Sequence, residues 1–277
     1  METFVTPIEI ETSNIDIPKI INYKDYVFTF GKKIEVPKIL MSVKTSEYGR
    51  TPIFTEGSLS LILGKQNSKK TAFILTIIQA FMNTFNEKLE TNFSGIKILY
   101  VDTEQSEYYV SKNAEKIRQM TNADDFQKMN ERIIYFRSNE LTSDQKKQAV
   151  EDILDEHKID YVILDNISDF LKDYNSSEES TSLKLWITSL LNRTKTHLTC
   201  VIHETAGIGK AKGHIGSLLE QFAETTLQIT EDKENRAVSR IYPKKLRDRK
   251  FGEFGITFNN YGLPYLTSLE IDDWTSE

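Results

Sequence analysis

The sequence predicts an α/β fold with a mainly parallel sheet flanked by helices and with antiparallel strands at its C-terminal end. After Ser58, short apolar runs alternate with longer mixed stretches, which is typical of parallel strands joined by helices. Beyond about Ala223, strand-like runs follow one another directly with turn residues between them, as in an antiparallel sheet. Hydrophobic residues at 39% and charged residues at 27% are ordinary for a globular protein.

Apolar runs and helical spacing give the expected elements in order. Parallel strands are expected at residues 59–63, 96–101, 132–136, 161–164 and 198–202. Helices are expected at residues 71–85, 108–120, 143–157 and 182–194. Ser143 is the expected N-cap of the third helix, and a further helix should begin at about His214. The last three strands are expected at residues 225–230, 237–243 and 254–259.

Residues 1–55 do not share this rhythm and contain four prolines, at positions 7, 18, 37 and 52. We expect an N-terminal arm or linker over residues 1–55, which packs across the domain or reaches a neighbouring subunit, and one domain over residues 56–277. The N-terminus lacks a basic region followed by an apolar core, and no apolar run is long enough to span a membrane. A cytoplasmic protein with no membrane partner is expected.

The single cysteine and the net charge add little about function. Cys200 lies in the apolar run LTCVIH, which favours a buried core thiol over a nucleophile or a metal ligand. The net charge of −6 does not indicate a nucleic-acid binder, although the basic run KKLRDRK could engage phosphates locally.

The most informative stretch lies between the first predicted parallel strand and the first helix, and it resembles a phosphate-binding loop. Its candidate ligand-binding residues are Gly64, Lys65, Gln66, Asn67, Ser68, Lys69, Lys70 and Thr71. In such a loop the lysine before the hydroxyl residue reaches the β- and γ-phosphates, and the hydroxyl helps to hold Mg²⁺. Lys69 stands where a glycine is expected, so it needs unusual backbone angles and adds a charge that could itself meet a phosphate. The alternative is a lysine-rich surface turn.

Polar residues also follow three of the other predicted strands, where ligands of open α/β sheets bind. Asp165 follows YVIL and is a candidate Mg²⁺ ligand, or else a helix cap. Glu104 follows the strand that ends in VDT and is a candidate base for the attacking water, or else a solvated acid. His203 ends the strand CVIH and is a candidate sensor of the γ-phosphate, or else a core histidine.

Two basic segments are candidates for contacts with nucleic acid or with a neighbouring subunit. The glycine-rich stretch HETAGIGKAKGHIGS is typical of a mobile loop, and Lys210 and Lys212 could contact nucleic-acid phosphates there. Lys245 and Arg247 would project to the same side of a strand, where two cations can grip one phosphate, and in a ring of subunits they could reach the nucleotide of the next subunit. Both segments could instead be ordinary solvated surface.

Together these motifs resemble the RecA-like P-loop ATPases, and within them the RepA and DnaB type of hexameric replicative helicase. The sequence is also similar to AAA-like ATPases encoded by plasmids and mobilizable elements. The resemblance covers residues 51–259 and lies in GKQNSKKT, VDTEQS, YVILDN, VIHETAGIGKAKGHIGS and KKLRDR.

The resemblance implies a RecA-like core that binds ATP and Mg²⁺ between the subunits of a ring, which would be a hexamer. Lys70 and Thr71 would hold the phosphates and the metal, with support from Asp165. Glu104 would activate water and His203 would couple hydrolysis to the following loop, while Lys245 and Arg247 would act on a neighbour's ATP.

Single-stranded DNA, and replication or mobilization proteins, are the partners that the resemblance implies. The expected function is an ATP-hydrolysing DNA helicase or motor. The alternatives are an ATP-gated assembly switch that binds DNA without unwinding it, and a nucleotide-binding protein with no nucleic-acid role.

Overall fold

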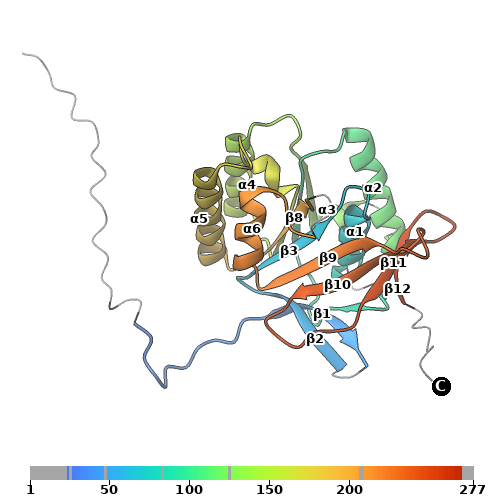
Figure 1. Ribbon diagram of the computed structural model, residues 1–277, viewed down its shortest axis with the longest axis horizontal. Coiled ribbons are helices and arrows are strands. Elements are labelled where there is room, and N and C mark those ends of the chain that lie inside the picture. The colour runs from blue at the N-terminus through green and yellow to red at the C-terminus, as the bar shows by residue number, and fades with distance from the viewer. Residues whose placement is uncertain are drawn as a thin grey trace, which may run out of the picture. The chain divides into compact units, whose positions relative to one another are not determined.

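The structure is a computed structural model that describes residues 24, 27–46, 49–82, 84–123, 126–205 and 209–269. The chain divides into two units, Met1–Val36 and Pro37–Glu277, and the second contains every strand labelled in Figure 1. This unit begins at Pro37, earlier than the domain start expected at residue 56, because residues 39–55 form two strands that pack into it.

A nine-stranded sheet forms the centre of the second unit. Its strand order is β12-β11-β10-β9-β3-β8-β7-β5-β6, parallel from β9 to β6 and antiparallel from β9 to β12. The parallel strands are β3 (Leu59–Gly64), β5 (Ile98–Asp102), β6 (Ile133–Arg137), β7 (Tyr161–Asp165), β8 (His197–His203) and β9 (Thr225–Glu231). The others are β10 (Ser239–Lys245), β11 (Phe254–Phe258) and β12 (Pro264–Ser268). The predicted fold class is confirmed, and β12 is an additional strand.

Helices cover both faces of this sheet (Figure 1). On one face lie α1 (Lys70–Phe81), α2 (Glu107–Met120) and the short α3 (Gln127–Asn130). On the other lie α4 (Ser143–Glu156), the 3-10 helix η2 (Ile167–Phe170), α5 (Ser177–Thr194) and α6 (Gly213–Phe222). Each face buries its own apolar cluster, since strand residues alternate between the two faces.

Two helix starts differ from the prediction because side chains cap them earlier in the sequence. The N-cap of α4 is Thr142, not Ser143, since the Thr142 hydroxyl and the Gln145 side chain form a reciprocal capping box. The helix α5 begins at Ser177 rather than at residue 182, because the Ser176 hydroxyl accepts a hydrogen bond from the Glu179 amide.

A second, three-stranded sheet was not predicted. It consists of β1 (Ile39–Thr45), β2 (Gly49–Thr55) and β4 (Leu89–Glu90), all antiparallel. Met41 and Phe54 are fully buried and belong to the same apolar cluster as α1. Prolines in this segment had favoured an irregular arm, but Pro52 lies within β2 and Pro37 precedes β1.

The ends of the parallel strands set the position of the candidate site. In the sheet register Gly64 of β3 pairs with His203 of β8, and Asp102 of β5 pairs with Asp165 of β7. These four positions therefore lie along one edge of the sheet. Cys200 is fully buried in β8, as predicted.

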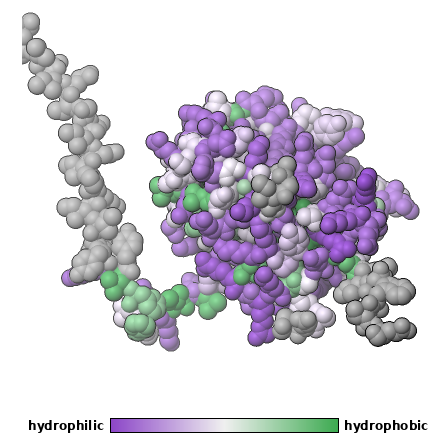
Figure 2. Space-filling model, viewed as in Figure 1, coloured by the Kyte–Doolittle hydropathy of each residue, from purple (hydrophilic) through white to green (hydrophobic). Residues whose placement is uncertain are grey.

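The surface of the second unit is mainly polar, in contrast to the two buried apolar clusters. Figure 2 shows a face on which hydrophilic side chains predominate. Within the ranges that the structure describes, none of the helices is both long enough and apolar enough to cross a membrane.

Candidate functional site

The loop between β3 and α1 folds closely over its own start. The Lys70 ammonium donates hydrogen bonds to the carbonyl oxygens of Gly64 (3.0 Å) and Lys65 (2.7 Å). Position 64 requires glycine, because a Cβ there would lie 2.4 Å from the Ser68 Oγ and 2.7 Å from the Ile229 carbonyl oxygen. The strand can therefore turn directly into the loop.

Several groups of this loop lack the partners that an anion would supply. The first turn of α1 contains no acidic residue, and its first three amides have no acceptor within the helix. Among the described residues, the Ser68 Oγ is a buried oxygen without a hydrogen-bond partner. A helix N-terminus, unpaired amides and an unpaired hydroxyl fit a phosphate group.

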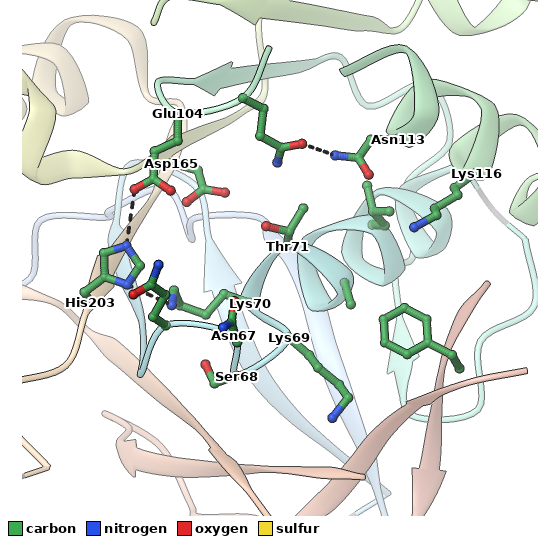
Figure 3. Close-up of a pocket in the computed structure, with 15 residues that line it drawn as sticks. Asn67, Ser68, Lys69, Lys70, Thr71, Glu104, Asn113, Lys116, Asp165 and His203 are labelled. Atoms are coloured by element: carbon green, nitrogen blue, oxygen red, sulfur yellow. Dashed lines mark hydrogen bonds and ion pairs between the residues drawn. The ribbon is translucent and has the colours of Figure 1, made fainter. Parts of the chain in front are cut away.

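Lys69 occupies the position where glycine was expected, and it has the backbone of a glycine. Its φ of 70° and ψ of 26° lie in the left-handed region. Its side chain leaves the loop, since the ammonium donates to the Ser239 Oγ (3.1 Å) and to the Arg236 carbonyl oxygen (3.4 Å). In Figure 3 it points away from Glu104 and Asp165. The structure thus places this charge beside β10 rather than over the loop, where it could have met a phosphate.

Glu104, His203 and Lys70 form one chain of hydrogen bonds that joins the start of α1 to the ends of β8 and β5 (Figure 3). The His203 Nδ1 lies 3.2 Å from the Lys70 Nζ, and the His203 Nε2 lies 3.2 Å from the Glu104 Oε1. An ammonium can only donate, so Nδ1 accepts and Nε2 carries the proton that Glu104 accepts. The structure therefore brings these three predicted residues together and assigns one tautomer to His203.

Glu104 is held as a carboxylate with one oxygen available. The hydrogen bond from His203 lowers its pKa, in spite of partial burial, and the Asn166 amide donates to the same Oε1 (3.2 Å). The other oxygen, Oε2, accepts no hydrogen bond from any residue in the described ranges. It can therefore accept a proton from a water molecule.

Asp165 lies at the end of β7 beside other carboxylates. Burial, together with the neighbouring charges of Asp102 and Glu104, raises the pKa of Asp165 to about 7. The Tyr100 hydroxyl donates to its Oδ2 at 3.1 Å. A divalent cation would relieve the repulsion, so Asp165 fits the predicted metal ligand, with the Thr71 hydroxyl in the same cavity. The alternative of a helix cap does not hold, because Asn166 caps η2.

Asp165→Asn is expected to stabilise the Mg²⁺-free protein at pH 8. The folded pKa of about 7 lies above the ordinary 3.8, so the folded state retains a proton that the unfolded state has lost. The contribution of Asp165 to the free energy of unfolding therefore falls as the pH rises from about 4 to about 7. A shift of about three pKa units is equivalent to about 4 kcal/mol at most, so we expect the thermal midpoint of the variant at pH 8 to be several degrees higher.

Scanning calorimetry in EDTA measures this difference. It should shrink at pH 5, where folded Asp165 is already neutral. Equal midpoints at pH 8 would show that the charge of Asp165 is not buried in this way.

These residues line a cavity of about 540 Å³. Glu104, Asp165 and His203 lie at one end with the loop, and Asn113 and Lys116 of α2 lie on the other side of Thr71 (Figure 3). The wall there also includes Ala72, Leu75 and Phe258, and the Lys116 ammonium lies 5.9 Å from the centre of the Phe258 ring. A phosphate-binding end and an aromatic end suit a nucleoside triphosphate.

The glycine-rich stretch begins at the same histidine. Residues 206–208 lie outside the described residues, and the stretch leads into α6 at Gly213. The Lys212 amide donates to the His203 carbonyl oxygen at 2.9 Å, so the base of the loop is fixed to the strand end. Lys210 and Lys212 are exposed, and the Lys212 ammonium lies 4.6 Å from the centre of the Tyr174 ring.

Lys245 and Arg247 lie at the opposite end of the sheet from the phosphate loop, where the parallel strands begin. Because β10 is antiparallel to β9, Lys245 pairs with Thr226 near the start of β9, whereas Ile229 pairs with Gly64 of the loop. The expected pair on one side of a strand is wrong, since β10 ends at Lys245 and Arg247 lies beyond it. The same chain therefore does not bring these cations to its own phosphate loop.

Both cations have partners at that edge. The Lys245 ammonium donates to the carbonyl oxygens of Glu220 (3.1 Å) and Gln221 (2.7 Å). Arg247 pairs with Glu224 at 2.9 Å, while its side chain is 71% exposed. An exposed guanidinium can exchange such a partner at little energetic cost.

A family model described as an AAA domain matches residues 48–207. The chain belongs to the AAA domain family. The matched region of this AAA domain includes the phosphate loop, Glu104, Asp165 and His203. It is therefore a P-loop ATPase, of a family that generally binds ATP with Mg²⁺. A comparison with curated proteins found no match.

Some residues of the site in this AAA domain were not singled out from the sequence. Asn166 directly follows Asp165 at a strand end, so the rule that located Asp165 could also have found it. Phe258 gave no such signal, because its place depends on β11 packing against α1, where the rings of Phe254 and Phe73 lie 6.4 Å apart.

Lys70→Ala is expected to weaken ATP binding about 30-fold or more, equivalent to about 2 kcal/mol or more, because it removes the buried cation that faces the phosphates. Titration calorimetry with Mg²⁺ and a non-hydrolysable ATP analogue measures the loss. Lys97→Ala is the control, since Lys97 is an exposed lysine that precedes β5 and does not line the cavity. Full affinity after Lys70→Ala would exclude this loop as the phosphate site.

Proposed function

We propose that this P-loop ATPase is a ring-forming DNA helicase or motor, of the RepA and DnaB type, that serves replication or mobilization of a plasmid or mobile element. The observation that carries the proposal is the position of His203. Its ring links Lys70 to Glu104, and its carbonyl oxygen holds the base of the glycine-rich loop. One residue thus touches both the hydrolytic groups and the loop that would contact DNA.

Within the site, each side chain has a distinct task. Lys70 and the loop amides bind the phosphates, while Asp165 and the Thr71 hydroxyl hold Mg²⁺. Bound Mg²⁺ neutralises charge on the phosphates. Glu104 orients the attacking water through Oε2 and takes up its proton.

Coupling to the loop follows from the same hydrogen bonds. When Lys70 turns to the phosphates, the His203 Nδ1 loses the donor that it has in this structure. The histidine can then re-orient, and its backbone is fixed to Lys212. Nucleotide binding would in this way be transmitted to the loop.

The loop supplies the contacts with single-stranded DNA. Lys210 and Lys212 are exposed cations on a protein of net charge −6, so they form a local basic site rather than a broad basic surface. Contacts with phosphates through two lysines per subunit would add up around a ring, and they would weaken as salt increases.

A ring also gives a task to Lys245 and Arg247. They lie at the edge of the sheet opposite to the phosphate loop, so they can reach a nucleotide only in a neighbouring copy. In a closed ring every subunit presents its phosphate loop to one neighbour and its Lys245 and Arg247 to the other. A hexamer is the ring size that the resemblance implies.

An ATP-gated switch that assembles on DNA without unwinding it is the second candidate. It is favoured by the two hydrogen bonds that Lys245 already makes to backbone carbonyl oxygens of its own chain. These bonds must break before Lys245 reaches a neighbour, which would suit slow turnover.

Unwinding of a forked duplex distinguishes the two candidates. The motor unwinds it with ATP, and the double variant Lys210→Ala, Lys212→Ala loses unwinding while it still binds ATP. The control is Lys97→Ala with Lys158→Ala, two exposed lysines that precede β5 and β7 at the other edge of the sheet. DNA binding without unwinding would favour the switch. Absence of salt-sensitive DNA binding would contradict both.

A further inference from the structure

Lys69 has an unusual combination of backbone and side chain for a phosphate loop. Its φ of 70° is the left-handed conformation that glycine adopts freely, whereas an L-residue with a side chain pays about 1–2 kcal/mol for it. Asn67, with φ 64°, is also left-handed, but asparagine tolerates this region better. The loop therefore has its expected shape although the residue at position 69 disfavours it.

The side chain of Lys69 supplies what the backbone lacks. Its ammonium donates to the Ser239 Oγ and to the Arg236 carbonyl oxygen, and both acceptors belong to the β9–β10 hairpin. Ser239 is fully buried and pairs in the sheet with Glu231 and Ile256, so this acceptor cannot move independently of the sheet.

The turn that carries the second acceptor is itself fixed. The Asp232 carboxylate accepts hydrogen bonds from the amides of Glu234 (2.8 Å) and Asn235 (2.9 Å), and it pairs with Arg240. The Asp232 amide donates to the Val238 carbonyl oxygen at 3.1 Å. Lys69 is thus attached to a rigid part of the protein, and a residue can be held in a strained conformation by such surroundings.

We propose that Lys69 is a positioning residue, which holds the phosphate loop in its anion-binding shape through the β9–β10 hairpin and does not itself bind phosphate. The role rests on the proposed use of the loop for ATP. Without the attachment, a side chain at position 69 would let the loop relax to a right-handed conformation. ATP would then bind only the fraction of molecules that still has the competent shape.

Three variants of Lys69 separate this role from direct phosphate binding. Their affinities for Mg²⁺ with a non-hydrolysable ATP analogue are measured by titration calorimetry on the full chain. Lys69→Gly loses the attachment but needs none, so its affinity stays close to that of the wild type. Lys69→Ala loses the attachment and keeps the strain, so binding weakens about 5- to 30-fold, the equivalent of 1–2 kcal/mol. Lys69→Arg can donate to the same acceptors and retains affinity.

Ser239→Ala supplies an independent test, because it changes the acceptor and leaves the loop sequence intact. Ser239→Ala alone should weaken binding of the ATP analogue, and it should have no further effect when it is combined with Lys69→Gly. This lack of additivity is expected if Ser239 acts only through Lys69. A general loss of stability would instead lower the thermal midpoints, which are measured in parallel.

The results that overturn the proposal are distinct. Equal weakening in Lys69→Gly and Lys69→Ala would show that the ammonium itself binds phosphate. Unchanged affinity in Lys69→Ala and Ser239→Ala would show that the attachment has no role. No binding by the wild type would instead overturn the use of the loop for ATP, and the role of Lys69 with it.

Discussion

Glu104→Gln is expected to lower ATP hydrolysis about 10²- to 10⁴-fold, because the amide cannot take a proton from the attacking water. ATP should remain bound with nearly unchanged affinity, since the phosphates are held by the loop and Lys70. The structure supports this separation: Glu104 keeps its oxygen Oε2 free while Oε1 is held by His203 and Asn166. Single-turnover hydrolysis and analogue titration on the same preparation measure the two effects.

The matched control is Glu107→Gln, an acid in the first turn of α2 outside the cavity lining. It should hydrolyse ATP like the wild type. Persistent turnover in Glu104→Gln would move the role of base to another acid of the strand ends. Asp102 is the first alternative, although its carboxylate already accepts hydrogen bonds from two amides and from the Tyr135 hydroxyl.

Arg247→Ala is expected to reduce hydrolysis by the assembled protein about 10³-fold, the lower end of what an arginine finger contributes. Affinity for the analogue in dilute protein should change little, because Arg247 lies at the edge opposite to its own loop. Arg249→Ala, in the same basic run, is the control.

Mixing two inactive variants tests whether Arg247 acts on a neighbour. Arg247→Ala has an intact phosphate loop, and Lys70→Ala has an intact basic edge. A mixed assembly contains interfaces that combine both intact halves, so part of the hydrolysis should return. If no activity returns although mixed assemblies form, the two sites do not act across an interface.

The rules for strand ends predicted the hydrolytic part of the site well. Glu104, Asp165 and His203 were expected to converge because each follows an apolar strand, and the sheet register places their strand ends along one edge. Such a prediction needs only the pattern of strands, since the topology of an open parallel sheet does the rest.

Residues whose place depends on packing between distant elements were not predictable in this way. Lys69 was recognised as a departure from the loop pattern, but its partner Ser239 lies 170 positions away on the first residue of β10. Likewise, β10 continues to Lys245, two residues beyond the expected end at residue 243, because its pairing with β9 resumes after a register shift between Pro243 and Lys245. Neither feature leaves a periodic signal in the sequence.

Steady-state ATP hydrolysis, with and without single-stranded DNA, is the measurement that tests the proposed motor function. It should be measured at low salt, because contacts with DNA phosphates weaken as salt increases. The protein concentrations should span assembly, because Arg247 is proposed to act on the ATP of a neighbouring subunit. A ring-forming DNA motor should show turnover that increases with protein concentration and is stimulated by DNA. Turnover that is independent of both, or ATP binding without turnover under every condition, would contradict the motor function.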